Sequence, residues 1–164
     1  MRYLIFLLLT GCASDCYKGE IVFWGDSLTA RWHIEGQDHK IEGVQYIGFP
    51  GKTIEGIAEN CVEAETIILQ VGGNNIIQGE DAATVASKIL KYKESLDGNV
   101  IIVSQFTGKG KLGEVMAEVN SYVEPDIYVN ITEDDIWDYA HLNENGYRKW
   151  KEAYEEWRDE NKNN

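Results

Sequence analysis

Short apolar runs alternate along this chain with amphipathic stretches, and this alternation constrains the fold more than any other feature. Short runs made largely of apolar residues occur at 20–24, 66–71 and 100–104, and weaker ones at 44–47 and 126–129. Runs of this kind are typical of parallel strands whose two faces are both covered by helices. We therefore expect the five runs to form the strands of one sheet.

Three longer stretches carry apolar residues at three- and four-residue spacing, which indicates amphipathic helices. They span 81–96, 112–123 and 143–158. The third contains a stripe of aromatic residues: Tyr147, Trp150, Tyr154 and Trp157. We interpret this stripe as core packing rather than as an aromatic binding surface.

Strands that alternate with helices over short connections predict a doubly wound α/β fold. We expect a flavodoxin-like, three-layer α/β/α arrangement with a parallel sheet of about five strands. The length of 164 residues suits one domain, expected at 20–158, followed by a polar tail at 159–164. Ligands of such sheets bind outside the carboxyl ends of the strands, so the motifs that follow strands matter most.

The amino-terminal segment has the features of an export signal. A basic start precedes an apolar run at 3–9 and the tetrapeptide LTGC at 9–12. The run is too short to cross a bilayer as a helix, which takes about 20 residues, but it fits the core of a signal peptide. The tetrapeptide resembles a bacterial lipobox, so we expect 1–11 to be removed and Cys12 to be lipidated. The alternative, a buried first strand, is disfavoured because a better strand candidate follows directly.

Lipidation at Cys12 predicts an exported protein held in the cell envelope, with 12–19 as a short tether. The formal net charge of -13 opposes binding to nucleic acid. The same charge disfavours adsorption to anionic lipid headgroups. We therefore expect no nucleic-acid partner and membrane contact only through the lipid at Cys12. The oligomeric state does not follow from the sequence.

Two further cysteines, Cys16 and Cys61, lie beyond the expected cleavage site. An exported protein can oxidise such a pair, but the distance between them in space does not follow from the sequence, so the pairing stays open. No CxxC motif or cluster of cysteine and histidine is present, which argues against a zinc site. We expect no metal.

A serine follows the first predicted strand, in Gly25-Asp26-Ser27-Leu28. Ser27 would lie at the carboxyl edge of the sheet and at a helix start, where unpaired backbone N–H groups face a developing negative charge. The alternative is that Ser27 or Asp26 only caps the helix, which is a common use of both residue types.

An aspartate and a histidine are spaced three residues apart near the other end of the chain. In Asp138-x-x-His141 the carboxylate can turn back to one ring nitrogen and leave the other free to take a proton from a serine. The alternative is a surface aspartate beside a histidine at a helix entry.

Glycine-rich motifs follow the second and third predicted strands. Gly48-x-x-Gly51 allows backbone N–H groups to approach a ligand closely. Asn74, in the run GGNN at 72–75, can donate a hydrogen bond to an oxyanion. The alternative for both is an ordinary turn, because glycine and asparagine dominate turns.

Taken in order, these four motifs resemble the sequence blocks of the SGNH (GDSL-type) hydrolase family, over a stretch from about residue 20 to about residue 157. The resemblance implies that Ser27 is the nucleophile, His141 the general base and Asp138 its orienting partner. It also implies an oxyanion hole built from the Ser27 and Gly51 N–H groups and the Asn74 amide.

Two positions depart from the family pattern. Asn75 stands where the family usually has aspartate, and Tyr46-Ile47 stands where an asparagine often precedes the second block. Neither departure touches the triad, although Asn75 can alter the turn that aims Asn74. Asp26 and Trp137 are further candidates for the substrate pocket, and simple packing is the alternative for Trp137.

The resemblance implies a serine ester hydrolase that forms an acyl-enzyme and needs no cofactor. Because the domain is short for this family, we expect an open site that removes short acyl groups, such as acetyl, from a carbohydrate or another small ester. A lysophospholipase or thioesterase with the same triad is one alternative. A catalytically silent binding lipoprotein with this fold is another. A nucleotide-binding flavodoxin-like protein is a third, but the chain lacks a phosphate-loop motif.

Overall fold

A computed structural model describes residues 16–106 and 108–162 of the chain. Its centre is one sheet of four parallel strands in the order β2-β1-β3-β4. The strands are β1 (Tyr17–Gly25), β2 (Val44–Gly48), β3 (Val62–Gln70) and β4 (Asn99–Ile102). Gly25 pairs with Gly48 on one side and with Gln70 on the other, so three strands end level at one edge of the sheet.

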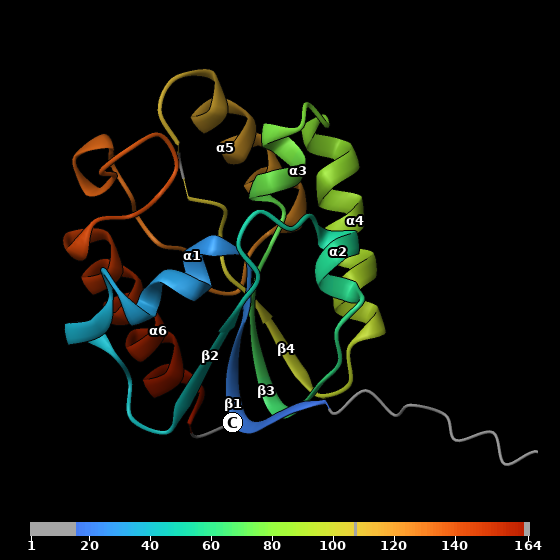
Figure 1. Ribbon diagram of the computed structural model, residues 1–164, viewed down its shortest axis with the longest axis vertical. Coiled ribbons are helices and arrows are strands. Elements are labelled where there is room, and N and C mark those ends of the chain that lie inside the picture. The colour runs from blue at the N-terminus through green and yellow to red at the C-terminus, as the bar shows by residue number, and fades with distance from the viewer. Residues whose placement is uncertain (1–15, 107, 163–164) are drawn as a thin grey trace, which may run out of the picture.

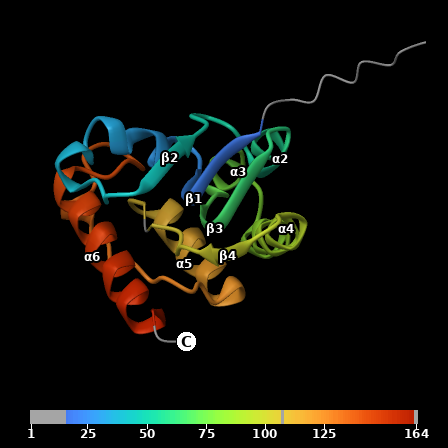
Figure 2. The same ribbon diagram turned by 90° about the horizontal axis from the view of Figure 1, so that it is seen from below.

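Helices cover both faces of the sheet, which confirms the predicted three-layer fold (Figures 1 and 2). One face carries α2 (Ile54–Ala58), α4 (Ala82–Ser95) and α5 (Lys111–Val123). The other carries α1 (Ser27–Ala30) and α6 (Glu144–Asn161). The short α3 (Gly73–Ile77) follows β3 at the carboxyl edge. Short 3-10 helices occur at Arg31–His33, Gln37–His39 and Glu133–Asp135.

The core on the α6 side of the sheet is built largely from aromatic side chains. Phe23 of β1 packs against Trp150 and Tyr154 of α6, with ring centroids 5.8 and 5.2 Å away. Trp32 packs against Tyr147 at 5.1 Å. All five rings are essentially buried. The aromatic stripe of the last helix is therefore core, as its spacing predicts.

The fifth predicted strand, at 126–129, forms only a single parallel bridge, between Ile127 and Val103. A side chain replaces the backbone pairing beside this bridge, because the N–H of Ile102 donates to Oδ2 of Asp126 at 2.7 Å. Two backbone hydrogen bonds make this bridge, from the Ile127 N–H to the Ile102 carbonyl at 3.1 Å and from the Ser104 N–H to the Ile127 carbonyl at 2.9 Å. The pairing covers a single residue, so the sheet has four strands rather than five.

The boundaries of the domain differ somewhat from expectation. Residues 17–19, predicted as tether, belong to β1, and α6 continues to Asn161, into the predicted polar tail. The expected signal peptide and Cys12 lie outside the described residues. Within the described ranges, no helix combines the length and the apolar character that a membrane crossing requires.

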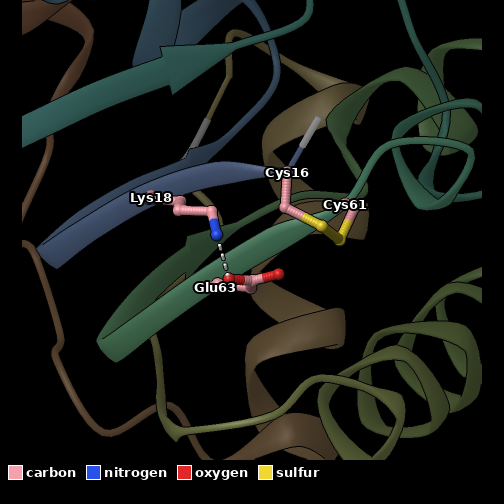
Figure 3. The surroundings of a disulfide bond; sticks show 4 residues. All are labelled: Cys16, Lys18, Cys61 and Glu63. Atoms are coloured by element: carbon pink, nitrogen blue, oxygen red, sulfur yellow. Dashed lines mark ion pairs between the residues drawn. A yellow bond between two sulfur atoms is a disulfide. The ribbon is translucent and has the colours of Figure 1, made fainter. Parts of the chain in front are cut away.

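Cys16 and Cys61 form a disulfide immediately before β1 and β3 (Figure 3). Their Cα atoms are 4.6 Å apart, and the N–H of Tyr17 donates to the Cys61 carbonyl at 2.9 Å. Farther along the same strand pair, Lys18 and Glu63 form an exposed ion pair at 2.8 Å. The parallel register of β1 and β3 thus brings together two cysteines whose pairing the sequence leaves open.

Replacing both cysteines with serine is expected to lower the free energy of unfolding by about 4 kcal/mol, because the bond closes a loop between residues 45 positions apart. Denaturant unfolding of the oxidised protein and of the Cys16→Ser, Cys61→Ser double variant measures this loss. Reductant should bring the wild type down to the variant and leave the variant unchanged. Equal stability of the oxidised wild type and the variant would contradict the expectation.

Candidate active site

The structure brings Ser27, His141 and Asp138 into one hydrogen-bonded chain. Oγ of Ser27 lies 3.1 Å from Nε2 of His141, across 114 residues of sequence. Nδ1 of His141 lies 2.7 Å from Oδ2 of Asp138. This is the arrangement in which a carboxylate orients an imidazole and the imidazole takes the proton of a serine hydroxyl.

The loop that carries Asp138 and His141 is closed on itself. Its ends pair through an antiparallel bridge between Ile136 and Leu142. Inside it, Oδ1 of Asp138 accepts the backbone N–H groups of Ala140 and His141 at 2.9 and 2.8 Å. One carboxylate oxygen therefore holds the loop and leaves the other for the imidazole ring.

The same contacts set the charge of Asp138. Partial burial raises the pKa of its carboxyl, but hydrogen bonds from the His141 ring and from the N–H groups of His141 and Ala140 outweigh burial and hold the pKa well below its usual range. Asp138 is thus a carboxylate throughout the neutral range, ready to stabilise a positively charged His141.

Ser27 starts α1 directly after β1, and two contacts fix that short helix. An added Cβ at Gly48 would lie 2.2 Å from the N atom of Ala30, so glycine lets α1 rest on the end of β2. From the other side, the hydroxyl of Tyr147 in α6 donates to the Leu28 carbonyl at 2.7 Å. These contacts fix the position of the serine relative to both the sheet and α6.

Asp26 lies beneath Ser27 and is only 2% exposed. Its Oδ1 accepts the N–H of Leu28 at 3.0 Å and so caps α1. Burial raises the pKa of this carboxyl to about 6, although the Leu28 N–H and the charge of His141 oppose the rise. Asp26, a candidate for the substrate pocket, is among the residues that border the cavity at Ser27, but almost none of its surface is exposed to solvent.

The three candidate oxyanion donors border the same cavity, which has a volume of about 500 Å³ and also contacts His141. Gly51 sits in the turn after β2 with φ at +75°, a conformation that side chains rarely adopt. Asn74, in α3, uses one Nδ2 hydrogen to bond the Lys52 carbonyl at 3.0 Å. This bond holds the amide beside Gly51 and leaves its second hydrogen for a ligand.

Asn75, the main departure from the family pattern, is fully buried. Its Oδ1 accepts the N–H of Ile54 at the start of α2, at 3.0 Å. Its Nδ2 donates to Glu55 and to Glu80 at 3.2 and 2.9 Å, and Lys88 bridges both carboxylates at 2.6 Å. An amide at this position can donate to two carboxylates, whereas an aspartate would add a third. No sequence motif announces this network, because its members come from separate segments.

Trp137, a candidate for the substrate pocket with simple packing as its alternative, is 54% exposed and is not among the residues that border the cavity at Ser27. Its ring stacks beside that of His141, with centroids 6.5 Å apart and planes at 27°. The guanidinium of Arg31 lies 5.1 Å from the centroid of the same indole. Arg31 does border the cavity, although no motif in the sequence marks it as a site residue.

The pH dependence of stability should reveal the buried Asp26. Its pKa rises from 3.8 to about 6 on folding, so its ionisation costs up to about 3 kcal/mol of stability as the pH climbs through that window. Asp26→Asn cannot ionise and still offers an oxygen to Leu28. The variant is expected to gain stability relative to the wild type between about pH 4 and about pH 7. Denaturant unfolding at both pH values measures the change, and a pH-independent difference would refute it.

No family model and no curated protein matches the sequence, but solved structures match its fold. A lipolytic protein of the G-D-S-L family from Veillonella parvula has a TM-score of 0.67 and 24% identity, over 86% of this chain and 97% of that one. A GDSL-like lipase from Bacteroides thetaiotaomicron has a TM-score of 0.71 and 16% identity, over 85% of this chain and 87% of that one.

A third match is the catalytic domain of peptidoglycan O-acetyltransferase A from Streptococcus pneumoniae, with a TM-score of 0.63 and 15% identity, over 91% of this chain and 97% of that one. At such identities the likeness concerns the fold. Together with the parallel sheet and its two helical layers, these matches show that the chain has the GDSL (SGNH) hydrolase fold.

Proposed function

We propose that this protein is a serine ester hydrolase that works through an acyl-enzyme, with Ser27 as nucleophile, His141 as general base and Asp138 as its orienting partner. One observation carries the proposal: the continuous hydrogen-bonded chain from Oγ of Ser27 through His141 to Asp138. The chain of contacts lies on a cavity at the carboxyl edge of the sheet, where ligands of such folds bind.

The first half of the reaction acylates the serine. His141 takes the proton of Ser27 as Oγ attacks the ester carbonyl, and Asp138 stabilises the imidazolium that forms. The carbonyl oxygen becomes an oxyanion, which the N–H groups of Ser27 and Gly51 and the amide of Asn74 are placed to bind. His141 then gives the proton to the departing alkoxide, which leaves as an alcohol, and the acyl group stays on Oγ.

The second half returns the enzyme with water as the nucleophile. His141 takes one proton from water as its oxygen attacks the acyl carbonyl. Collapse of the second tetrahedral intermediate breaks the bond to Oγ, and His141 returns the proton to Ser27. The products are one carboxylic acid and one alcohol for each water consumed.

We further propose that the acyl group is short, such as acetyl, and that the alcohol is a carbohydrate or another small molecule. Ile34 and Ile77 on the cavity wall are 68% and 53% exposed, which supports a site with an open mouth and no long acyl channel. The name of the Streptococcus pneumoniae neighbour, which concerns acetyl transfer on peptidoglycan, agrees with a small acyl group.

A second candidate is a lysophospholipase or thioesterase with the same triad. The largely apolar wall of the cavity favours this alternative, because an alkyl chain would pack against it. The apolar wall residues are Leu28, Ala30, Ile34, Pro50, Ile77, Met116 and Ala140. We also propose that the protein is exported, lipidated at Cys12 and held in the cell envelope, whichever ester it hydrolyses. The disulfide between Cys16 and Cys61 supports export, because such bonds persist in oxidising compartments.

Hydrolysis of p-nitrophenyl acetate, butyrate and octanoate tests the mechanism and the acyl length together. We expect acetate to be the preferred ester and Ser27→Ala to lower kcat by at least about a thousandfold. A fluorophosphonate probe should label the wild type and not the variant. Ser121→Ala, which removes an exposed hydroxyl on α5, is the matched control and should keep full activity.

Preference for octanoate would support the lipase-like alternative. A folded wild type that neither hydrolyses an ester nor reacts with the probe would instead favour a silent binding protein of this fold.

Asn74→Ala is expected to lower kcat about a hundredfold with little change in KM, because an oxyanion donor acts mainly in the transition state. Steady-state kinetics on the preferred ester measures both constants. A rise in KM with an unchanged kcat would show that Asn74 binds the ground-state substrate instead.

A further inference from the structure

Arg31 is the one lysine or arginine on the wall of the catalytic cavity, within the described part of the chain. The rest of the protein is strongly acidic, with a formal net charge of -13. A single cationic residue on the wall that also holds Ser27 and His141 makes this cavity more favourable to an anion than the rest of the surface. Solubility alone does not explain why Arg31 lies on the wall of this cavity.

The position of Arg31 follows from the geometry of the nucleophile's own helix. Arg31 comes four residues after Ser27, where α1 passes into a 3-10 turn. Side chains four residues apart on a helix lie on the same face. Arg31 and Ser27 therefore border the same cavity.

Two contacts hold the guanidinium in place. Nη1 of Arg31 donates to Oε1 of Glu35 at 2.6 Å, and both side chains are largely buried, 25% and 21% exposed. One face of the group lies over the Trp137 indole. Glu35 is its one hydrogen-bond acceptor among the residues described, so the Nε and Nη2 donors are left for a ligand.

The simplest alternative is an ordinary ion pair between residues four apart in the chain. The chain offers such a pair for comparison, because Arg148 and Glu152 also lie 2.6 Å apart. That pair is 45% and 57% exposed, lies on α6 and borders no catalytic group. Arg31 differs from Arg148 in its burial, its aromatic platform and its place on the cavity wall.

We propose that Arg31 is a specificity-determining residue that binds a carboxylate on the alcohol part of the substrate. The proposal rests on the esterase function proposed above. If the acyl group is as short as acetyl, a charged group has room only on the alcohol. The substrate class is thus an acyl ester of a carboxylate-bearing alcohol, such as an acidic sugar.

A carboxylate fits this site better than a phosphate does. The planar fork of a guanidinium matches the two oxygens of a carboxylate. Glu35 already compensates part of the charge of Arg31, and a dianion would meet the acidic remainder of the protein with no second cation on the described cavity wall.

Matched acetate esters test the proposal. We compare 3- and 4-carboxyphenyl acetate with the corresponding carbamoylphenyl acetates, which are neutral and of the same shape. The measured quantity is the ratio of kcat/KM for the charged ester to that for the neutral one, so differences in intrinsic reactivity cancel between variants. Arg31→Gln is expected to lower this ratio about tenfold, the effect of one charge-assisted hydrogen bond at a partly exposed site.

Two further variants sharpen the result. Arg31→Lys keeps the charge but loses the fork, so its ratio should fall less than that of Arg31→Gln. Arg148→Gln removes the matched ion pair outside the cavity and should leave the ratio at the wild-type value. If Arg31→Gln has the same ratio as the wild type, the proposal is overturned. This includes the case in which the variant loses the same factor in kcat/KM on the charged and the neutral ester.

The wild type alone supplies an independent test. Raising the ionic strength from about 20 mM to about 500 mM screens a partly exposed charge pair and should lower the ratio. A ratio that does not respond to salt would count against the proposal even if the Arg31 variants failed to fold. Failure of the esterase function looks different, because the wild type would then turn over neither the charged nor the neutral esters.

Discussion

The level ends of three parallel strands are the constraint on which the rest of this molecule depends. Gly25 stands opposite both Gly48 and Gln70 in the sheet, so the chain leaves β1, β2 and β3 at the same height. The segments that follow carry Ser27, Gly51 and Asn74. The spacing is tight, since a Cβ on Gly25 would lie 2.2 Å from the Gln70 carbonyl oxygen. Backbone pairing therefore sets the height at which these three segments begin, and local contacts, such as the hydrogen bond from Asn74 to the Lys52 carbonyl, then fix the groups within them.

Two carboxyl groups interact with His141 from very different surroundings. Asp138 accepts backbone and ring N–H groups, so its pKa is depressed and it stays charged. Asp26 is buried beneath Ser27 and has few donors, so its pKa is raised to about 6. Environment, rather than residue type, assigns the first to orienting the imidazole and the second to capping α1. The site thus places a permanent negative charge on the side of the imidazole away from the serine.

Much of this architecture follows from the sequence, because its signals are local. Apolar runs and helical stripes predict the strands of the sheet and the long helices, and four short motifs predict which residues meet at its edge. Signals that depend on three-dimensional neighbours were missed or left open. The Cys16–Cys61 bond needs the register of β1 and β3, and the contacts of Asn75 need three separate segments. The place of Arg31 becomes visible only once the cavity is defined. The apolar run at 126–129 predicts a full fifth strand, but it pairs at one residue only, and beside that bridge the N–H of Ile102 bonds the side chain of Asp126.

The disulfide at the amino ends of β1 and β3 also has a mechanical consequence. A pull on the chain ahead of Cys16 enters β1, and the covalent bridge passes the load at once to β3. The two central strands then resist together along their length, in shear, instead of peeling apart one bond at a time. Ser27 follows the opposite end of β1, about 25 Å away along the nine-residue strand. Force applied ahead of Cys16 is therefore borne by the bridged strands before it can reach the cavity.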